Sequence, residues 1–415
     1  MKGLRKNVYL AAGYYTVSMG TGRREFHPKK PRPSLEDYVI EAGRGVVAQL
    51  PSAELIDECV ISNFMASRFC RQANLAGLVP TIDPALELSP VTRVEGACGS
   101  GGMALYTAVK SVLAETADIA LALGVEVQST VKAVYGSDYL ALAGHYATER
   151  KAGHAYFFPA KFSDRCKAYV ERYGRPRTRE AMAHWYAQSI ENARRCPKAQ
   201  EHHNETRDLV AAGMTAPNAA SFVEELNYYD CSKVSDGGAA VLVCSEEGLA
   251  KAGIAREHAA QIVGLAQVEA NLTEQPKDPA ALATTAAAAR RALAMAGLGV
   301  ADIGVLELHD CFTITAALAL EAAGFAPPGG GPSFILEGKT RLDGELPTNT
   351  TGGLIGYGHP VGATGIRQAI DLLAQVTGKA GASQAKLGGG RSHGMLVNMG
   401  GNDKTLTSMV VRAAG

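Results

Sequence analysis

The sequence predicts an α/β protein in which helices cover both faces of a mostly parallel sheet, and in which this arrangement occurs twice. Short apolar runs rich in Val and Ile alternate with longer runs whose apolar residues recur at helical spacing. Both halves of the 415-residue chain show this alternation and end in a Gly-rich strand. We therefore expect an internal duplication, with two α/β lobes whose sheets stack around shared helices.

The first half alternates strands and helices as far as about residue 125. In "SLEDYVIEAGRGVVAQL", Ser34 precedes an amphipathic run whose first turn holds Glu36 and Asp37, which indicates the start of a helix. Another helix is expected directly after Cys98, in "GSGGMALYTAVKSVLAE". We expect strands at 7–13, 56–64, 92–96 and 118–128, and helices at 34–50 and 99–115.

The middle of the chain, residues 128–230, breaks this alternation. It is rich in Tyr, His, Arg and Lys, and it contains Trp185, the only tryptophan. We expect an inserted subdomain of helices and loops on the N-terminal lobe. Sheet-like sequence resumes at Cys231, in "CSKVSDGGAAVLVCSEEGL".

The second half repeats the theme. An Ala-rich stretch predicts a helix that ends at Gly297, because glycine readily adopts the left-handed conformation that follows many helices. The predicted domains are an N-terminal lobe, residues 1–265, which carries the insertion, and a C-terminal lobe, residues 266–415. In the second lobe we expect strands at 259–270, 303–312, 393–403 and 404–414, and helices at 278–298 and 313–324.

Composition and charge exclude several classes of protein. The chain is 47% hydrophobic and 20% charged, which is typical of a globular protein. Lys+Arg and Asp+Glu both number 41, so nucleic acid has no broad positive surface to bind, and an anionic ligand must meet a local basic patch. No apolar run approaches the roughly 20 residues that span a bilayer, and the N-terminal apolar stretch is too short for a signal peptide. We expect a cytoplasmic protein with no membrane span and no nucleic-acid partner.

The eight cysteines form no C-x-x-C pair. In a long chain without an export signal we expect them to be reduced, and most of them to be buried. Because the spacing typical of zinc ligands is absent, we expect no metal site.

Cys98 stands out because small residues surround it in "VEGACGSGGMAL", where a strand-like run ends and a helix begins. The dipole and unpaired N–H groups of a helix N-terminus favour an anion, so we expect the pKa of this thiol to fall from about 8.5 into roughly the 3.5–7.5 range. Small neighbours also let a carbonyl approach and free backbone N–H groups to bind an oxyanion. The alternative is a tight turn with a packed cysteine.

A second candidate site lies in "ELHDCFT", where a buried apolar run leads directly into His309, Asp310 and Cys311. Ligand crevices lie at the carboxyl ends of parallel strands, and residues two apart on a strand point to the same side. We therefore expect His309 and Cys311 to face one cavity. The alternative is that Asp310 caps the next helix and that Cys311 is incidental.

The third candidate is His359, in the stretch "GGLIGYGHPVGATG" with its six glycines. The pattern superficially resembles a dinucleotide loop, but a His-Pro at its centre does not suit a close approach of the backbone to pyrophosphate. We expect a rigid loop that holds one imidazole before a helix; the alternative is a packed histidine at a turn. Together the three stretches supply thiols and imidazoles that can activate a nucleophile and polarise a carbonyl.

At these stretches the chain resembles the thiolase family, over nearly its whole length apart from the inserted middle. The resemblance rests on "GACGSGG", "HDCF", "GHPVGATG" and "VNMGG", in the family's order. "HDCF" is similar to the sterol-carrier-protein-type thiolases, and we expect a thiolase unit without a sterol-carrier domain. The resemblance implies a thiolase-like fold of duplicated β-α-β-α-β-α-β-β lobes layered α-β-α-β-α. It also implies an acyl-CoA C-acyltransferase that makes or cleaves a 3-oxoacyl-CoA and needs no cofactor beyond its coenzyme A thioester substrates.

The resemblance implies a role for each candidate residue. Cys98 would be the nucleophile that takes an acyl group, and His359 the base that activates it. His309, with His359, would bind the thioester oxygen of the second acyl-CoA. Cys311 would move the α-proton. The backbone N–H groups of Cys98 and Gly400 would form the second oxyanion hole.

One position departs from most thiolases, which carry the acid/base cysteine in a C-x-G motif where this chain has Asn398. Cys311 matches the subgroup's relocation of that thiol. One alternative is a non-catalytic or retro-aldolase relative that acts as a subunit of a complex, but such a relative should lack one thiol. Another is a ketoacyl synthase, which has no need for a thiol at Cys311.

The partners expected are acyl-CoA and CoA and a second copy of the chain in a dimer or larger assembly; the resemblance also implies a small zinc-ribbon/OB-fold protein as a candidate partner. The resemblance to thiolases and the frequency of symmetric dimers imply the second copy. A neutral protein must bind anionic CoA through a local patch, and the insertion holds the densest group of basic residues. The candidate CoA-binding residues are Lys132, Arg150, Lys151, Lys161 and Arg165.

Overall fold

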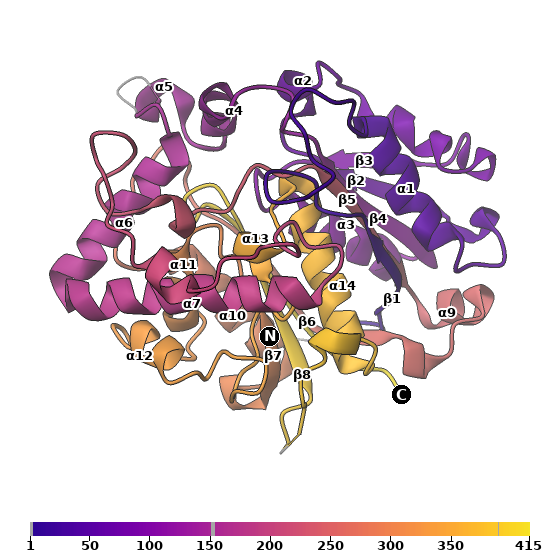
Figure 1. The fold of residues 1–415 in the computed structure, drawn as a ribbon. Helices are drawn as coiled ribbons and strands as arrows, with labels where there is room; N and C mark the ends of the chain where they lie inside the picture. The colour runs from indigo at the N-terminus through magenta and orange to yellow at the C-terminus, as the bar shows by residue number, and fades with distance from the viewer. Residues whose placement is uncertain (1–2, 151–153, 389) are drawn as a thin grey trace.

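The computed structural model describes residues 3–150, 154–388 and 390–415 (Figure 1). Nine strands in these ranges form one sheet, in the order β3-β2-β4-β5-β1-β6-β9-β8-β7. The strands are β1 (Tyr9–Tyr15), β2 (Glu58–Ser62), β3 (Val91–Val94), β4 (Ile119–Glu126), β5 (Gly237–Cys244), β6 (Ala260–Glu269), β7 (Ile303–Glu307), β8 (His393–Gly400) and β9 (Thr405–Ala413). Each lies within or beside a run predicted from the sequence.

The main helices also lie where the apolar spacing predicts them. Ser34 caps the first helix and forms a capping box with Asp37, and Gly297 ends the Ala-rich helix at a φ of 69°. The α-helices are α1 (Leu35–Val47), α2 (Ala66–Phe69), α3 (Ser100–Leu113), α4 (Ala133–Leu140), α5 (Tyr146–Glu149), α6 (Phe157–Tyr173), α7 (Arg175–Arg195), α8 (Leu209–Gly213), α9 (Glu246–Ala252), α10 (Ala283–Ala296), α11 (Thr313–Ala322), α12 (Gly331–Leu336), α13 (Gly353–Gly356) and α14 (Thr364–Val376).

The two halves of the sheet have the same topology. In the N-terminal half the order is β2-β4-β5-β1 with β3 added at the edge, and in the C-terminal half it is β7-β8-β9-β6. The pairs β2–β4 and β7–β8 are both parallel, and the pairs β4–β5 and β8–β9 are both antiparallel. The correspondence supports the predicted duplication.

The two half-sheets are joined, which the sequence did not predict. Strands β1 and β6 pair antiparallel over two positions, Tyr9 with Gln261 and Leu10 with Ala260. The sheets therefore stack around shared helices, as expected, but they meet along one short seam. The seam is invisible in the sequence because only two residue pairs form it.

Helices α3 and α14 form the layer that both half-sheets share. Each contacts strands of both halves, and they also contact each other. Their apolar side chains join one core cluster with residues of both half-sheets, including Leu10, Leu105, Ile366, Leu396 and Val411. Helix α1 packs on the outer face of the N-terminal half and α10 on that of the C-terminal half. This is the predicted α-β-α-β-α layering, with α14 near the centre of Figure 1.

The inserted segment is mainly helical, as predicted, but it covers more than the lobe from which it leaves. It runs from α4 to α8, and α7 packs against α11, α12 and α13 of the C-terminal half. Trp185 of α7 is fully buried there. In Figure 1, α6 and α7 lie beside α11 and α12. Within the described ranges, no helix combines the length and apolarity needed to cross a bilayer.

Candidate active site

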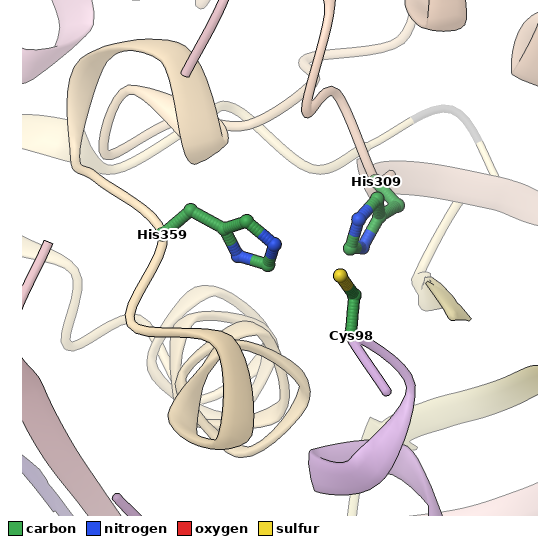
Figure 2. Close-up of side chains that lie close together, drawn as sticks. All are labelled: Cys98, His309 and His359. Carbon is green, nitrogen blue, oxygen red and sulfur yellow. The ribbon is translucent and has the colours of Figure 1, made fainter. Parts of the chain in front are cut away.

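Three segments that are far apart in the sequence meet at one point. Cys98 precedes α3, His309 follows β7, and His359 precedes α14. The ligand atoms of these side chains, the cysteine sulfur and one nitrogen of each imidazole, all lie within 4.8 Å of one another. Figure 2 shows the Cys98 sulfur pointing toward the two rings. The structure thus brings together three of the four predicted catalytic side chains.

A constrained turn presents Cys98. Ala97 has a φ of 52°, in the left-handed region that is unfavourable for a residue with a Cβ. The Ser100 hydroxyl stabilises the turn, because it accepts from the Gly96 N–H at 2.9 Å and donates to the Ala97 carbonyl. A Cβ at Gly400 would collide with the Gly96 carbonyl oxygen. The end of β8 therefore packs directly against the turn.

The thiol of Cys98 is less acidic than predicted. Its removal from water raises its pKa to about 12, and the negative charge of Glu126 acts in the same direction. The backbone N–H groups of Gly401 and of Cys98 itself lower the pKa, but by less. The expectation of a pKa between about 3.5 and 7.5 was wrong because desolvation outweighs the N–H groups at this helix start. Besides the N–H of Cys98 itself, the N–H that lowers the pKa of this thiol is that of Gly401, next to the predicted Gly400.

The hydrogen bonds of His359 fix its tautomer. The Thr364 hydroxyl donates to the Pro360 carbonyl at 3.0 Å, so its oxygen accepts from His359 Nδ1, which lies 2.7 Å away. Nδ1 therefore carries a hydrogen, and Nε2 has no hydrogen-bond partner among the described residues. The backbone of His359 is held by Ser235 Oγ and Gln128 Nε2. The free Nε2 lone pair can accept a proton.

Both imidazoles are neutral near pH 7. Burial lowers the pKa of His359 to about 3, and the positive charge of Arg367 adds to this effect. Burial also lowers the pKa of His309 well below its ordinary value, and His359 and Arg367 contribute. The two rings are perpendicular, with centroids 5.1 Å apart. Neutral rings can act as hydrogen-bond acceptors and as bases.

Cys311 and His309 face one cavity, as their spacing predicts. Burial raises the pKa of the Cys311 thiol well above its ordinary value, and the neighbouring Cys98 raises it further. Asp310 does not cap the next helix. It accepts from the Leu354 N–H at 2.7 Å and from Trp185 Nε1 at 3.0 Å, and it thereby ties the end of β7 to the insertion.

Glu126, at the end of β4, was missed by the sequence analysis. Burial raises its pKa to about 7. It links the segment after β2 to the loop of His359. Its carboxylate accepts from the backbone N–H groups of Phe64, Met65 and Gly362, at 2.9, 3.1 and 3.2 Å, and from Asn63 Nδ2 at 3.1 Å. The available signal was an acidic residue at the end of an otherwise apolar strand.

The four predicted catalytic side chains line a cavity of about 390 Å³. The inserted segment supplies much of its wall, from Val131 to Phe162 and from Phe222 to Tyr228. Aromatic rings dominate the lining: Phe69, Tyr156, Phe158, Phe162, Phe222, Tyr228 and Phe312. Such a surface favours an apolar ligand group next to the thiols.

Of the predicted CoA-binding residues that the structure describes, none belongs to this lining. Lys132 directly precedes α4 and lies in the sequence between the lining residues Val131 and Ala133. Lys161 pairs with Glu149 at 2.7 Å. Arg150 pairs with Asp138 at 2.8 Å, and Lys151 lies outside the described residues.

The structure does not support Arg165 as a phosphate ligand. This residue is 1% exposed, and its guanidinium donates to Asn402 and to the carbonyl groups of Pro279 and Ala281. Lys233, which no sequence argument singled out, does line the cavity and pairs with Glu201.

The cluster of Cys98, His309 and His359 also has the ligand types that zinc accepts. Ligand atoms around a tetrahedral zinc lie about 3.5 Å apart, closer than the 4.8 Å limit of this cluster. Metal binding would also occupy the nucleophile and the free lone pair of His359. That the reaction needs no metal ion therefore stays a prediction.

Comparison with known proteins identifies the chain. Residues 36–247 match the thiolase N-terminal domain, and residues 266–412 match the thiolase C-terminal domain-like family. The chain belongs to the thiolase family. Among similar proteins, the acetyl-CoA acetyltransferase of Methanothermobacter thermautotrophicus is 35% identical over 378 residues, which cover 90% of this chain and 93% of that protein.

Three further relatives bear on the subgroup and the fold of this thiolase. Rat sterol carrier protein 2 is 30% identical over 84% of this chain and 63% of its own length. The solved structure of the Ltp2-ChsH2(DUF35) aldolase superimposes with a TM-score of 0.79, 21% identity and 99% coverage of both chains. The structure of human mitochondrial 3-ketoacyl-CoA thiolase superimposes with a TM-score of 0.70, at 16% identity over 100% of both chains, which confirms the predicted thiolase-like fold.

Proposed function

We propose that this thiolase is an acyl-CoA C-acyltransferase, which condenses two acyl-CoA molecules or cleaves a 3-oxoacyl-CoA through an acyl group on Cys98. The observation that carries the proposal is one thiol beside two neutral imidazoles, of which His359 has a free Nε2. The acetyl-CoA acetyltransferase relatives support the same class of reaction. Two thiols and two imidazoles supply its acid–base and nucleophilic chemistry.

Cleavage begins with attack of Cys98 on the 3-oxo carbon. Because its raised pKa keeps Cys98 protonated, His359 Nε2 takes the proton from Sγ as the carbon–sulfur bond forms. The bond between C2 and C3 then breaks, and its electron pair moves into the enolate of the departing acyl-CoA. His309 stabilises the enolate oxygen, and Cys311 gives its proton to the α-carbon.

The second half of the reaction restores every group. Coenzyme A attacks the acyl group on Cys98, and the proton of its thiol passes to Cys311. The sulfur of Cys98 leaves and recovers its proton from His359. The backbone N–H groups of Cys98 and of the Gly400–Gly401 segment stabilise the tetrahedral oxyanion. Condensation follows the same steps in reverse.

The subgroup and the partners belong to this proposal. "HDCF" and the similarity to sterol carrier protein 2 support a sterol-carrier-protein-type thiolase. The name of the Ltp2-ChsH2(DUF35) aldolase, which pairs two components, supports a small partner protein of the zinc-ribbon/OB-fold kind. The cytoplasmic location stays a prediction.

Strand β3 supports the proposed homodimer. It ends the sheet, three of its four residues are half-buried, and Leu88 just before it is 98% exposed. An exposed edge strand is a template for pairing with a second copy. Sedimentation at low micromolar concentration should give at least twice the mass of one chain; the mass of a single chain would contradict the dimer.

Mass spectrometry of the intact protein tests the central step. Wild type incubated with a panel of acyl-CoAs should gain one acyl group, and Cys98→Ala should gain none. Cys70→Ala, which removes a half-buried thiol outside the cavity lining, is the matched control and should acylate normally. Wild type that forms no adduct with any acyl-CoA would favour the retro-aldolase or non-catalytic alternative.

A further inference from the structure

Asn398 occupies the centre of the site although an amide cannot titrate near neutral pH. It lies on β8 and is fully buried. Its Oδ1 lies 3.0 Å from the Gly102 nitrogen, and its Nδ2 lies 3.2 Å from the Cys98 carbonyl oxygen and 3.3 Å from His309 Nδ1. One amide therefore contacts α3, the nucleophile turn and an imidazole.

The orientation of this amide follows from its partners. A backbone N–H can only donate, so Oδ1 must face Gly102. A carbonyl oxygen can only accept, so Nδ2 must face Cys98. A Cβ at Gly365 would collide with Asn398 Oδ1, so only a glycine at this position leaves space for the amide, which packs closely against it.

This orientation determines the tautomer of His309. One hydrogen of Asn398 Nδ2 serves the Cys98 carbonyl, and the other is directed at His309 Nδ1. Nδ1 must then accept, so it carries no hydrogen. In the neutral ring the hydrogen lies on Nε2, the nitrogen farther from Asn398. His359 has the opposite tautomer, with its hydrogen on Nδ1.

We propose that Asn398 is a positioning residue that keeps the hydrogen of His309 on Nε2, so that this ring donates to the thioester oxygen while His359 accepts the proton of Cys98. The inference rests on the proposed function, because it assigns the two imidazoles opposite duties in the same reaction. With its hydrogen on Nδ1, His309 would turn a lone pair toward the enolate oxygen and repel it. Loss of one such donor lowers kcat by about 10²–10³-fold.

The test reads the tautomer directly, without reference to activity. In protein labelled with ¹⁵N-histidine, NMR distinguishes a protonated Nδ1 from a protonated Nε2, and a His309→Gln variant assigns the His309 signals. Wild type should show His309 protonated on Nε2. In Asn398→Asp the nearly isosteric carboxylate can only accept, so the hydrogen should move to Nδ1. A wild-type protein with His309 protonated on Nδ1 would overturn the proposal whatever the variants do.

Kinetics and a matched control complete the test. Asn398→Asp should lose about 10²–10³-fold in kcat for thiolysis. Glu41→Gln, which alters an exposed contact with Tyr14, is the control and should leave the His309 signals unchanged. An Asn398→Asp variant with the wild-type tautomer and rate would also refute the proposal. Failure of Cys98 to acylate in wild type would refute the proposed function alone, because the tautomer of His309 is measured independently.

Discussion

Glu126 and Asn398 occupy the same position in the two halves of the duplicated fold, but they do different work. Glu126 lies two residues beyond the last β2–β4 pair, and Asn398 lies two residues beyond the last β7–β8 pair. Each crosses to the opposite half: Glu126 accepts from Gly362 before α14, and Asn398 accepts from Gly102 in α3. The duplication thus preserves a reciprocal link between the halves.

The difference lies in what else each side chain binds. Glu126 is an acceptor only, and its remaining contacts hold the backbone that follows β2. Asn398 can also donate, and its amide reaches the Cys98 carbonyl and His309. The comparison shows that a carboxylate, which accepts hydrogen bonds, is sufficient where only backbone segments have to be held in place. An amide suits the half in which a ring must be both held and oriented.

Removal of Cys311 should have the largest effect. In the proposed mechanism Cys98, from the N-terminal half, takes the acyl group, and Cys311, from the C-terminal half, moves the proton, so the substitution should stop the second step and leave the first. Cys311→Ala should still acquire an acyl group on Cys98. It should lose about 10²–10⁴-fold in thiolysis, because Cys311 is the group proposed to protonate the α-carbon. It should also exchange the α-hydrogens of acetyl-CoA with deuterated water more slowly. Near-normal thiolysis and exchange would reduce Cys311 to a packing residue.

The pH dependence of Cys98 alkylation tests whether burial or the start of α3 has the larger effect on the pKa of this thiol. Because the raised pKa lies at about 12, the thiolate fraction should rise about tenfold per pH unit from pH 7 to 10, without a plateau. The rate of modification by iodoacetamide, followed by mass mapping at Cys98, should rise in parallel. A plateau beginning near pH 7 would show instead that the start of α3 lowers the pKa, as the sequence alone had indicated.

Glu126→Gln tests the structural member of the pair. In wild type, buried N–H groups donate to both oxygens of the Glu126 carboxylate. In the variant the amide nitrogen replaces one of these oxygens, so some of these donors would lose their acceptor. The free energy of unfolding should fall by about 1–3 kcal/mol in chemical denaturation. Glu41→Gln, which alters an exposed contact with Tyr14, should change it by less than about 0.5 kcal/mol. Equal free energies of unfolding for the two variants would show that the hydrogen bonds of Glu126 do not stabilise the fold.

The smallest effect concerns CoA binding by the inserted segment, which covers both halves. Lys132→Ala should raise KM for CoA thioesters by up to about fivefold, the range of one exposed charge pair. Lys161→Ala should raise it less, because Glu149 already binds that ammonium group. Both variants should keep the maximal extent of Cys98 acylation. An unchanged KM in both variants would show that CoA binds to a surface other than the inserted segment.

The sequence predicted much of the fold because local signals determine it. Ser34 and Gly297 mark helix ends by their own chemistry, and the apolar runs predicted the strands at the right places. Cys98, His309 and His359 could be singled out because each sits at a strand end or helix start, where α/β proteins place their ligands.

Long-range packing determined what the sequence could not show. The sequence predicted Arg165 as a phosphate ligand, but in the fold its guanidinium is buried and donates to backbone carbonyl groups. The pKa of Cys98 depends on how much water its cavity admits, which helix dipole arguments omit. Asn398 was visible as a departure from most thiolases, but its equivalence with Glu126 required the sheet register.

The reciprocal link between the halves also governs when the catalytic centre comes into being during synthesis. The contacts of Gly102 with Asn398 and of Gly362 with Glu126 span 296 and 236 residues of sequence. Contacts between such distant residues form slowly. A nascent chain that has emerged only as far as β6 contains Cys98, the proposed nucleophile, but neither of the two imidazoles. In the proposed mechanism the chain becomes competent for reaction only after the segments that carry His309 and His359 have joined α3.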